Sequence, residues 1–121
     1  MEGLREMNFG LWDGLHYKDI ARRYPKEWDD WGSNYINSSP VEGESFQHFY
    51  HRVSITINEI LKLYKDKKIA VVTHDGFMKA ATSILLKMGQ EGFWNFYFEH
   101  GQFSIFEIQD DHCTIKKINC I

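Results

Sequence analysis

The sequence feature that most constrains the fold is the apolar run IAVVT at residues 69–73, which ends at His74. Its β-branched residues are typical of a strand that is buried on both faces of a parallel sheet. From Gly76 to Lys87 the apolar residues recur at helical spacing, and Gly89 follows as a suitable stop. The stretch therefore predicts a buried strand, a turn that carries His74, and a helix.

A longer helix is predicted upstream of this strand. Apolar residues recur at steps of three, four and seven from Phe46 to Tyr64, and Ser45 is a suitable N-cap. At the other end of the chain, the segments FSIFEI and CTIKKI flank QDDH, which predicts a β-hairpin with an acidic turn. Helix, strand, helix and hairpin together predict an α/β class in which helices cover a mixed sheet, as one domain over residues 1–121.

The first third of the chain is less regular. Residues 1–15 predict a packed loop, and residues 16–32 predict short helices interrupted at Pro25, because proline cannot continue a helix that begins at Tyr17. Residues 33–43 then predict a polar loop. Loops of this length in a compact domain are often binding loops or lids.

Composition excludes several classes of function. The chain has 121 residues and a formal net charge of −3 without a long basic run, so the electrostatic signature of nucleic-acid binding is missing. No segment resembles a signal peptide, and no apolar run approaches the length of a membrane span. The odd spacing of Cys113 and Cys120 would point them to opposite faces of one strand, which makes a poor disulfide pair. We therefore expect a reduced, cytoplasmic protein with neither nucleic-acid nor membrane partners.

His74 is the first candidate functional residue. Ligands of doubly wound sheets collect outside the carboxyl ends of the strands, and His74 follows such an end. The amides of Asp75 and Gly76 open the next helix, and a helix N-terminus beside a ring that can carry charge favours an anion. The alternative interpretation is a histidine that caps the strand end, packed and hydrogen-bonded.

Glu6 is the second candidate. It lies among leucine, methionine and phenylalanine, where partial desolvation would raise the pKa of its carboxyl and make it a usable proton donor. The alternative is a surface glutamate in a mobile N-terminal tail.

A metal site is a third possibility, on one face of the long helix. Glu44, His48 and His51 have the spacing of neighbours on such a face. Their order is not that of the zinc-protease signature and a fourth ligand is missing, so we expect no metal and no cofactor. The EHG motif at residues 99–101 predicts a turn before the hairpin.

Three segments taken in order resemble the histidine phosphatase superfamily, and most closely its α-ribazole phosphatase branch: LREMNFGLWDGL, EGESFQHFYHRV and IAVVTHDGFMKA. The resemblance runs over essentially the whole chain, including the closing hairpin and the pair Ile118 and Asn119. It implies the phosphoglycerate-mutase-like fold, with helices packed on a mostly parallel sheet. Here that fold would be incomplete at the N-terminus and would end in a β-hairpin.

The resemblance also implies roles for individual residues. Glu6 matches the general acid that protonates the leaving oxygen of a phosphoester. His74 matches the second pocket histidine, which holds the transferring phosphoryl group, and the backbone amide of Asp75 would help to bind it. Gly43, Glu44 and Ser45 match a segment that closes a substrate loop over the site and begins the long helix.

The main departure from the family is the absence of the Arg-His-Gly motif that carries its nucleophilic histidine. We therefore expect a phosphomonoester hydrolase that works through a phosphohistidine in a full-length protein, whereas this chain alone is inactive. No pocket role is transferred to the following arginines: Arg5, Arg22, Arg23 and Arg52. Because a first strand would lie inside the sheet, its absence would leave open edges, and we expect a homo-oligomer.

The residues after Glu6 bear on the substrate, which we expect to be a small phosphorylated metabolite. In the mutase branch an arginine and an aromatic hydroxyl serve a substrate carboxylate, at the positions of Met7 and Phe9. This argues against a phosphoglycerate mutase, which stays as an alternative. Lys79 replaces a more usual arginine, which we regard as a minor difference. A further alternative is a non-catalytic paralogue that binds a phosphorylated ligand or a partner, although such a protein would not need Glu6.

Overall fold

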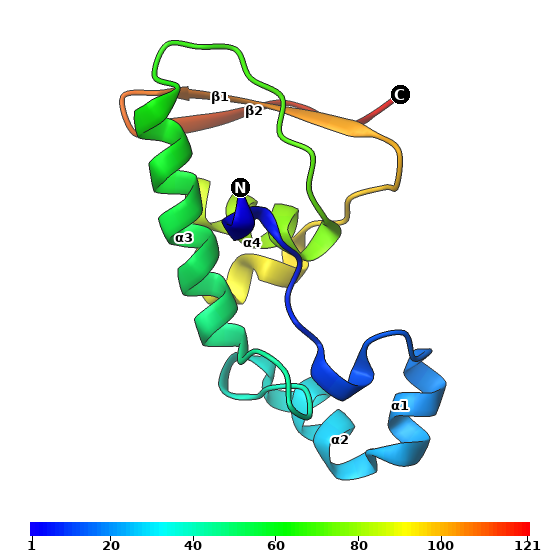
Figure 1. Ribbon diagram of the computed structural model, residues 1–121. Helices are drawn as coiled ribbons and strands as arrows, with labels where there is room; N and C mark the ends of the chain where they lie inside the picture. Colours follow the sequence, from blue (N-terminus) through cyan, green and yellow to red (C-terminus); the bar gives the residue numbers. More distant parts are fainter. The chain divides into compact units, whose positions relative to one another are not determined.

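The computed structural model describes residues 1–121 (Figure 1). Its contacts divide the chain into two compact units. The first unit comprises residues 1–6 and 53–121, and the second comprises residues 7–52. Helix α3 (Phe46–Leu63) begins in the second unit and ends in the first. No helix combines the length and the apolar character that crossing a membrane requires.

The second unit is built from short helices. Its elements are η2 (Gly10–Trp12), α1 (Tyr17–Arg23), α2 (Pro25–Asn34), η3 (Tyr35–Asn37) and the first turns of α3. The predicted break at Pro25 is confirmed, since Pro25 is the first residue of α2, where its missing N–H costs no hydrogen bond.

The predicted loop over residues 33–43 is wrong in its first part, because α2 runs through Asn34 and η3 follows directly. The polar side chains that suggested a loop bond to the end of the helix instead. The Ser33 hydroxyl donates to the Asp29 carbonyl at 2.9 Å, and the Ser38 hydroxyl donates to the Asn34 carbonyl at 2.6 Å. Serine hydroxyls compete for backbone groups in this way at helix ends as readily as in loops.

Aromatic rings form the core of the second unit. The Trp12 ring packs edge to face against Trp28 and Trp31, with centroids 5.7 and 6.1 Å apart. Phe46 and Phe49, on the first turns of α3, are fully buried, and the Tyr35 ring meets Phe46 edge to face at 4.9 Å. Edge-to-face pairs add to the stability that burial alone supplies. The tryptophans therefore serve packing.

The start of α3 follows the sequence prediction. The Ser45 hydroxyl accepts a hydrogen bond from the His48 amide at 3.1 Å, which is the contact of an N-cap with the third residue of a helix. The predicted N-cap is thus confirmed.

The first unit contains the second half of α3, helix α4 (Asp75–Leu85), the short helices η1 (Glu2–Leu4) and η4 (Gln90–Asn95), and strands β1 (Phe103–Gln109) and β2 (His112–Cys120). Its buried apolar side chains come from α3, α4, η4, the segment after η4 and the hairpin: Val53, Ile60, Phe77, Ala80, Ala81, Phe93, Phe98 and Cys113. Helix α4 contributes most of its length to this core, since six of its residues are buried.

Helix α4 ends at Leu85, four residues before the predicted stop at Gly89. The Met88 amide donates to the Ser83 carbonyl at 2.8 Å, and the Lys87 amide donates to the Ile84 carbonyl at 3.0 Å. This pair of bonds is a Schellman motif, which places its left-handed residue at Lys87 with φ of 58°. The prediction assumed that a glycine would occupy the left-handed position after the helix. In the structure Lys87 occupies that position, so the helix ends earlier.

The predicted hairpin is confirmed. β1 and β2 pair antiparallel, Gln109 faces His112, and the two residues between them have φ of 49° and 66°. Positive φ at both loop positions defines a type I′ turn, which matches the twist of the flanking strands. The predicted turn at residues 99–101 is also confirmed, with Gly101 at φ of 72°.

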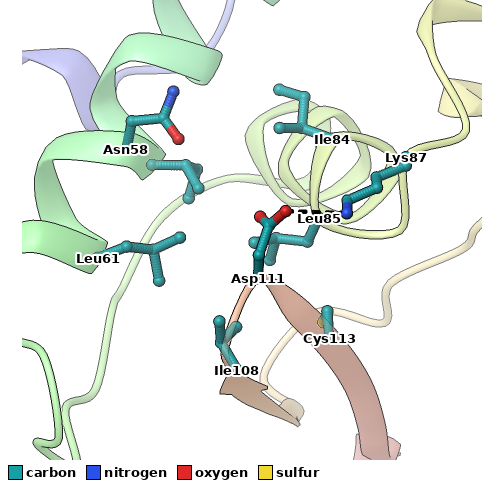
Figure 2. Close-up of a pocket in the computed structure, with 9 residues that line it drawn as sticks. Asn58, Leu61, Ile84, Leu85, Lys87, Ile108, Asp111 and Cys113 are labelled. Atoms are coloured by element: carbon teal, nitrogen blue, oxygen red, sulfur yellow. Dashed lines mark hydrogen bonds and ion pairs between the residues drawn. The ribbon is translucent and has the colours of Figure 1, made fainter.

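The hairpin, the end of α3 and the end of α4 line a partly open pocket of about 60 Å³ (Figure 2). Its lining is mostly apolar, with the ion pair of Lys87 and Asp111 at 3.0 Å on one side. Cys113 lies in the same lining, and burial raises the pKa of its thiol. Both Cys113 and Cys120 are free thiols.

The prediction that residues 69–73 form a buried strand is wrong for this chain. The segment is not part of any strand, and its N–H and C=O groups form no hydrogen bonds with other backbone groups. Val72 is 91% exposed. The sheet of the structure holds β1 and β2 only, and neither pairs with this segment. A β-branched run forms a strand only where another strand accepts its hydrogen bonds, and none does so here.

Candidate functional site

The start of α4 is the place where the structure brings the predicted catalytic residues together. The Gly76 amide donates a hydrogen bond to Glu6 Oε2 at 2.9 Å, although the two residues are 70 positions apart in the sequence. The Thr73 hydroxyl donates to the Leu4 carbonyl at 2.7 Å, so the N-terminal segment is held along residues 73–76 by two bonds. Glu6 is therefore half-buried against the helix rather than part of a mobile tail.

His74 occupies the N-cap position of α4. Its backbone is extended, with φ of −114° and ψ of 163°, and its carbonyl accepts the Met78 amide at 3.0 Å. The side chain makes no capping hydrogen bond and the residue is exposed. The interpretation of His74 as a packed, hydrogen-bonded cap is thus wrong, and the ring is accessible to a ligand.

The first amides of α4 point toward the same place. The first four N–H groups of a helix have no partner within it, and the positive end of the helix dipole lies there. The Gly76 amide is taken by Glu6, whereas the Asp75 amide has no hydrogen-bond partner in the structure. An exposed histidine, a free amide and a carboxyl group therefore meet at one helix end. Such a set can bind an anion and transfer a proton.

Gly76 is required by the close approach of Glu6. A Cβ atom at Gly76 would overlap the Glu6 carboxylate. Alanine would favour the helix by about 0.5–1 kcal/mol but would displace this carboxylate from the amide.

Gly76→Ala is therefore expected to uncouple Glu6 from α4. In the wild-type chain, Glu6→Ala should lower the free energy of unfolding by about 1.5 kcal/mol, since a charge-assisted hydrogen bond is lost. In the Gly76→Ala background the same substitution should cost less than about half of that, because the bond is already broken. Urea unfolding of the four chains measures the difference. Equal costs in the two backgrounds would contradict the assignment.

The predicted substrate-loop residues lie in the second unit. The Glu44 carboxylate is 9% exposed and accepts two hydrogen bonds from Arg52, at 2.9 and 3.1 Å. It also contacts His48 Nδ1 at 2.8 Å and accepts the Asn8 amide at 3.2 Å. Burial raises the pKa of Glu44, but the hydrogen bonds from Arg52, Asn8 and His48 outweigh burial and hold the pKa below its ordinary value of 4.5.

The same Glu44 carboxylate belongs to the possible metal site with His48 and His51, and Arg52 already binds it. Glu44 uses both carboxylate oxygens on Arg52, and no group of three histidine, cysteine or carboxylate side chains gathers as metal ligands anywhere in the chain. Gly43 allows a close approach, since a Cβ there would lie 2.7 Å from the Asn8 carbonyl oxygen. Gly43, Glu44 and Ser45 thus order the start of α3, and their role in closing a loop over substrate stays a prediction.

Sequence reasoning missed a charged contact beside His74. Lys79 is buried and its ammonium lies 2.7 Å from Asp75 Oδ2 and 4.7 Å from the centre of the Trp94 ring. The spacing of four residues between Asp75 and Lys79 is the one signal that could have found the pair, because such residues are neighbours on a helix. Nothing in the sequence indicates that Trp94 covers the lysine.

Comparisons with known proteins agree with these features. The family model of the histidine phosphatase superfamily (branch 1) matches residues 1–121. Among curated proteins, the adenosylcobalamin/alpha-ribazole phosphatase of Salmonella typhimurium is 29% identical over 116 residues, which are 96% of this chain and 57% of that protein. Phosphoserine phosphatase 1 of Hydrogenobacter thermophilus is 25% identical over 94% of this chain and 54% of its own length. The chain thus spans little more than half the length of these relatives.

A solved structure gives the same result for the fold. The alpha-ribazole phosphatase from Shigella flexneri superposes with a TM-score of 0.89 at 28% identity, over 98% of this chain and 59% of that one. The predicted phosphoglycerate-mutase-like α/β class is therefore confirmed, with helices and a C-terminal hairpin. On the match of its whole length to the family model, the chain belongs to the histidine phosphatase superfamily.

Proposed function

We propose that these residues are part of a phosphomonoester hydrolase of the histidine phosphatase type, acting in the manner of an α-ribazole phosphatase. The family match over residues 1–121 and the named phosphatases among the relatives support this proposal. The observation that supports it most is the hydrogen bond from the Gly76 amide, two residues after His74 in the chain, to the Glu6 carboxylate.

The chemistry of the reaction assigns each group a task. A histidine nucleophile outside these residues attacks phosphorus, the bond to the leaving oxygen breaks, and Glu6 donates its proton to that oxygen. The His74 ring and the free Asp75 amide hold the equatorial oxygens of the transferring group, whose charge must be stabilised throughout. Water then cleaves the phosphohistidine and releases phosphate. This chain contains no Arg-His-Gly motif, so alone it should bind phosphate without turning over a phosphoester.

The proposed substrate is a small phosphorylated metabolite similar to α-ribazole phosphate, which would place the protein in cobalamin biosynthesis. The side chains of Met7 and Phe9 carry no group that binds a carboxylate, so they favour this class over phosphoglycerate. We also propose a cytoplasmic location, supported by the two free cysteines, since reduced thiols persist in that compartment.

Phosphate binding through His74 tests the proposal. Calorimetric titration of the chain with inorganic phosphate at pH 7 should show saturable binding. His74→Ala should weaken this binding more than about tenfold, because a charged hydrogen bond to the ligand is lost. The control is His100→Ala, since His100 is an exposed histidine in the turn before β1. Absence of binding, or equal binding by His74→Ala, would contradict the proposal.

A second interpretation is a non-catalytic phosphate-binding paralogue, and a turnover assay tests whether this chain alone is inactive. We expect para-nitrophenyl phosphate to stay unhydrolysed above background with the wild-type chain. Turnover that disappears in His74→Ala would show that this chain contains a nucleophile of its own and would contradict its inactivity. The retention of Glu6, bonded to the start of α4, favours the phosphatase, since a protein that only binds phosphate has no use for a proton donor.

We further propose that this chain self-associates through its unpaired extended segment. Residues 69–73 expose apolar side chains, and their backbone hydrogen-bonding groups have no partner strand. Such an edge pairs with another chain. Sedimentation velocity at micromolar concentration should show a dimer or larger species, and Val71→Pro should shift it toward the monomer because proline removes a donor from the edge. A monomer for the wild-type chain would contradict this.

A further inference from the structure

Lys79 is a buried lysine at the start of α4. It is 7% exposed, although lysine is seldom buried without a specific partner. Its ammonium is held between two groups, the Asp75 carboxylate at 2.7 Å and the face of the Trp94 ring at 4.7 Å. The aromatic face attracts the cation and shields it from solvent. A buried positive charge thus lies one helical turn after Asp75, the residue that follows His74.

The Asp75 carboxylate would repel an anion bound at the same helix end. Its backbone amide is free to bind a phosphoryl oxygen, yet its own side chain is a carboxylate. A phosphate ester carries close to two negative charges at neutral pH, so an uncompensated carboxylate beside it would oppose binding.

Lys79 is the one side chain that forms an ion pair with this carboxylate. Asp75 Oδ2 bonds to the ammonium of Lys79, whereas Asp75 Oδ1 is buried without a hydrogen-bond partner. No other cation contacts the Asp75 side chain in the structure. Lys79 is therefore the only side-chain cation that pairs with the negative charge at the start of α4.

We infer that Lys79 controls the affinity of this site for phosphorylated ligands, because it neutralises the Asp75 side chain and so allows the Asp75 amide to receive a dianion. This inference rests on the proposed function. Lys79 acts through Asp75 and does not touch the ligand, so it is a positioning residue and not a catalytic one. Trp94 holds the ammonium on the side of Asp75.

Phosphate affinities of three variants test the inference, measured by calorimetry at pH 7 with inorganic phosphate. Lys79→Met keeps the length of the side chain and removes its charge, and it should weaken binding about tenfold. Asp75→Asn removes the opposing charge and should tighten binding severalfold. The double variant Asp75→Asn, Lys79→Met should bind within about threefold of the wild type, since both charges are gone. A purely structural role of Lys79 would leave the double variant as weak as Lys79→Met.

Lys87→Met is the matched control, just beyond the other end of the same helix. Lys87 also pairs with an aspartate, Asp111 at 3.0 Å, and its loss changes the net charge by the same amount (Figure 2). It should alter phosphate affinity less than about twofold, because a distant exposed charge is screened by salt. Circular dichroism confirms the fold of each variant. If Lys79→Met does not fold, Asp75→Asn still decides, since it must tighten binding.

The outcomes separate this inference from the proposed function. Unchanged or weaker binding by Asp75→Asn, or a double variant that binds as weakly as Lys79→Met, overturns the role of Lys79. If His74→Ala still weakens binding more than about tenfold in that case, the proposed function stands. Absence of phosphate binding by the wild-type chain overturns the proposed function and this inference with it.

Discussion

Phe77→Ala is expected to lower the free energy of unfolding by about 4 kcal/mol, the upper range for a buried aromatic ring. Phe77 is 1% exposed and lies on the first turn of α4, directly after Gly76. Its removal leaves a cavity that the neighbouring side chains fill only in part. For a chain of this size, the loss corresponds to a fall of roughly 15 °C in the melting temperature.

Two further variants make this result specific to packing. Phe77→Leu keeps most of the apolar volume and should cost only about 1 kcal/mol. Phe103→Ala removes a ring that is half exposed on β1, so it should cost less than about half of the Phe77→Ala value. Urea and thermal unfolding at neutral pH measure all three. Equal effects of Phe77→Ala and Phe103→Ala would contradict the placement of Phe77 in the core.

Arg52→Met is expected to have the second largest effect, a loss of about 3 kcal/mol in the free energy of unfolding. The substitution leaves the Glu44 carboxylate largely buried, without the two hydrogen bonds that Arg52 donates. The guanidinium also lies over the Phe49 ring at 5.2 Å, so a cation–π contact is lost as well. Arg22→Met is the control, because its pair with Asp19 at 3.1 Å is exposed and should contribute less than about 1 kcal/mol.

The pH dependence of the free energy of unfolding tests whether the charge of Glu44 causes the stability that Arg52→Met removes. Its pKa in the folded chain lies below the ordinary value of 4.5, so the unfolded chain binds a proton more readily as the pH falls. The stability that the Glu44 charge contributes is complete above pH 4.5 and is lost as the pH falls through the lower folded-state pKa. Wild-type and Glu44→Gln chains should therefore differ in melting temperature at pH 7 and converge in acid. A difference that does not shrink as the pH falls below 4.5 would contradict this assignment.

Local sequence determined most of the helices and turns of this protein. The interruption at Pro25 and the cap at Ser45 depend on backbone groups within a few residues, so these predictions needed no tertiary information. The type I′ turn between β1 and β2 could likewise be predicted from local sequence, because aspartate tolerates the positive φ that this turn requires. The family could also be predicted, since its motifs are short and occur in order along the chain.

Tertiary structure decided what the candidate site contains. That Glu6 bonds to the amide of Gly76 follows from how residues 1–6 pass along the chain before α4, and no spacing in the sequence encodes a contact over 70 positions. Burial of Lys79 under Trp94 likewise depends on how η4 packs on α4. For residues 69–73 the composition predicts a strand that the structure does not form. Only a partner strand can supply the hydrogen bonds of a strand, and this segment has none. Propensity is a property of a segment, whereas pairing, burial and charge compensation belong to the assembled fold.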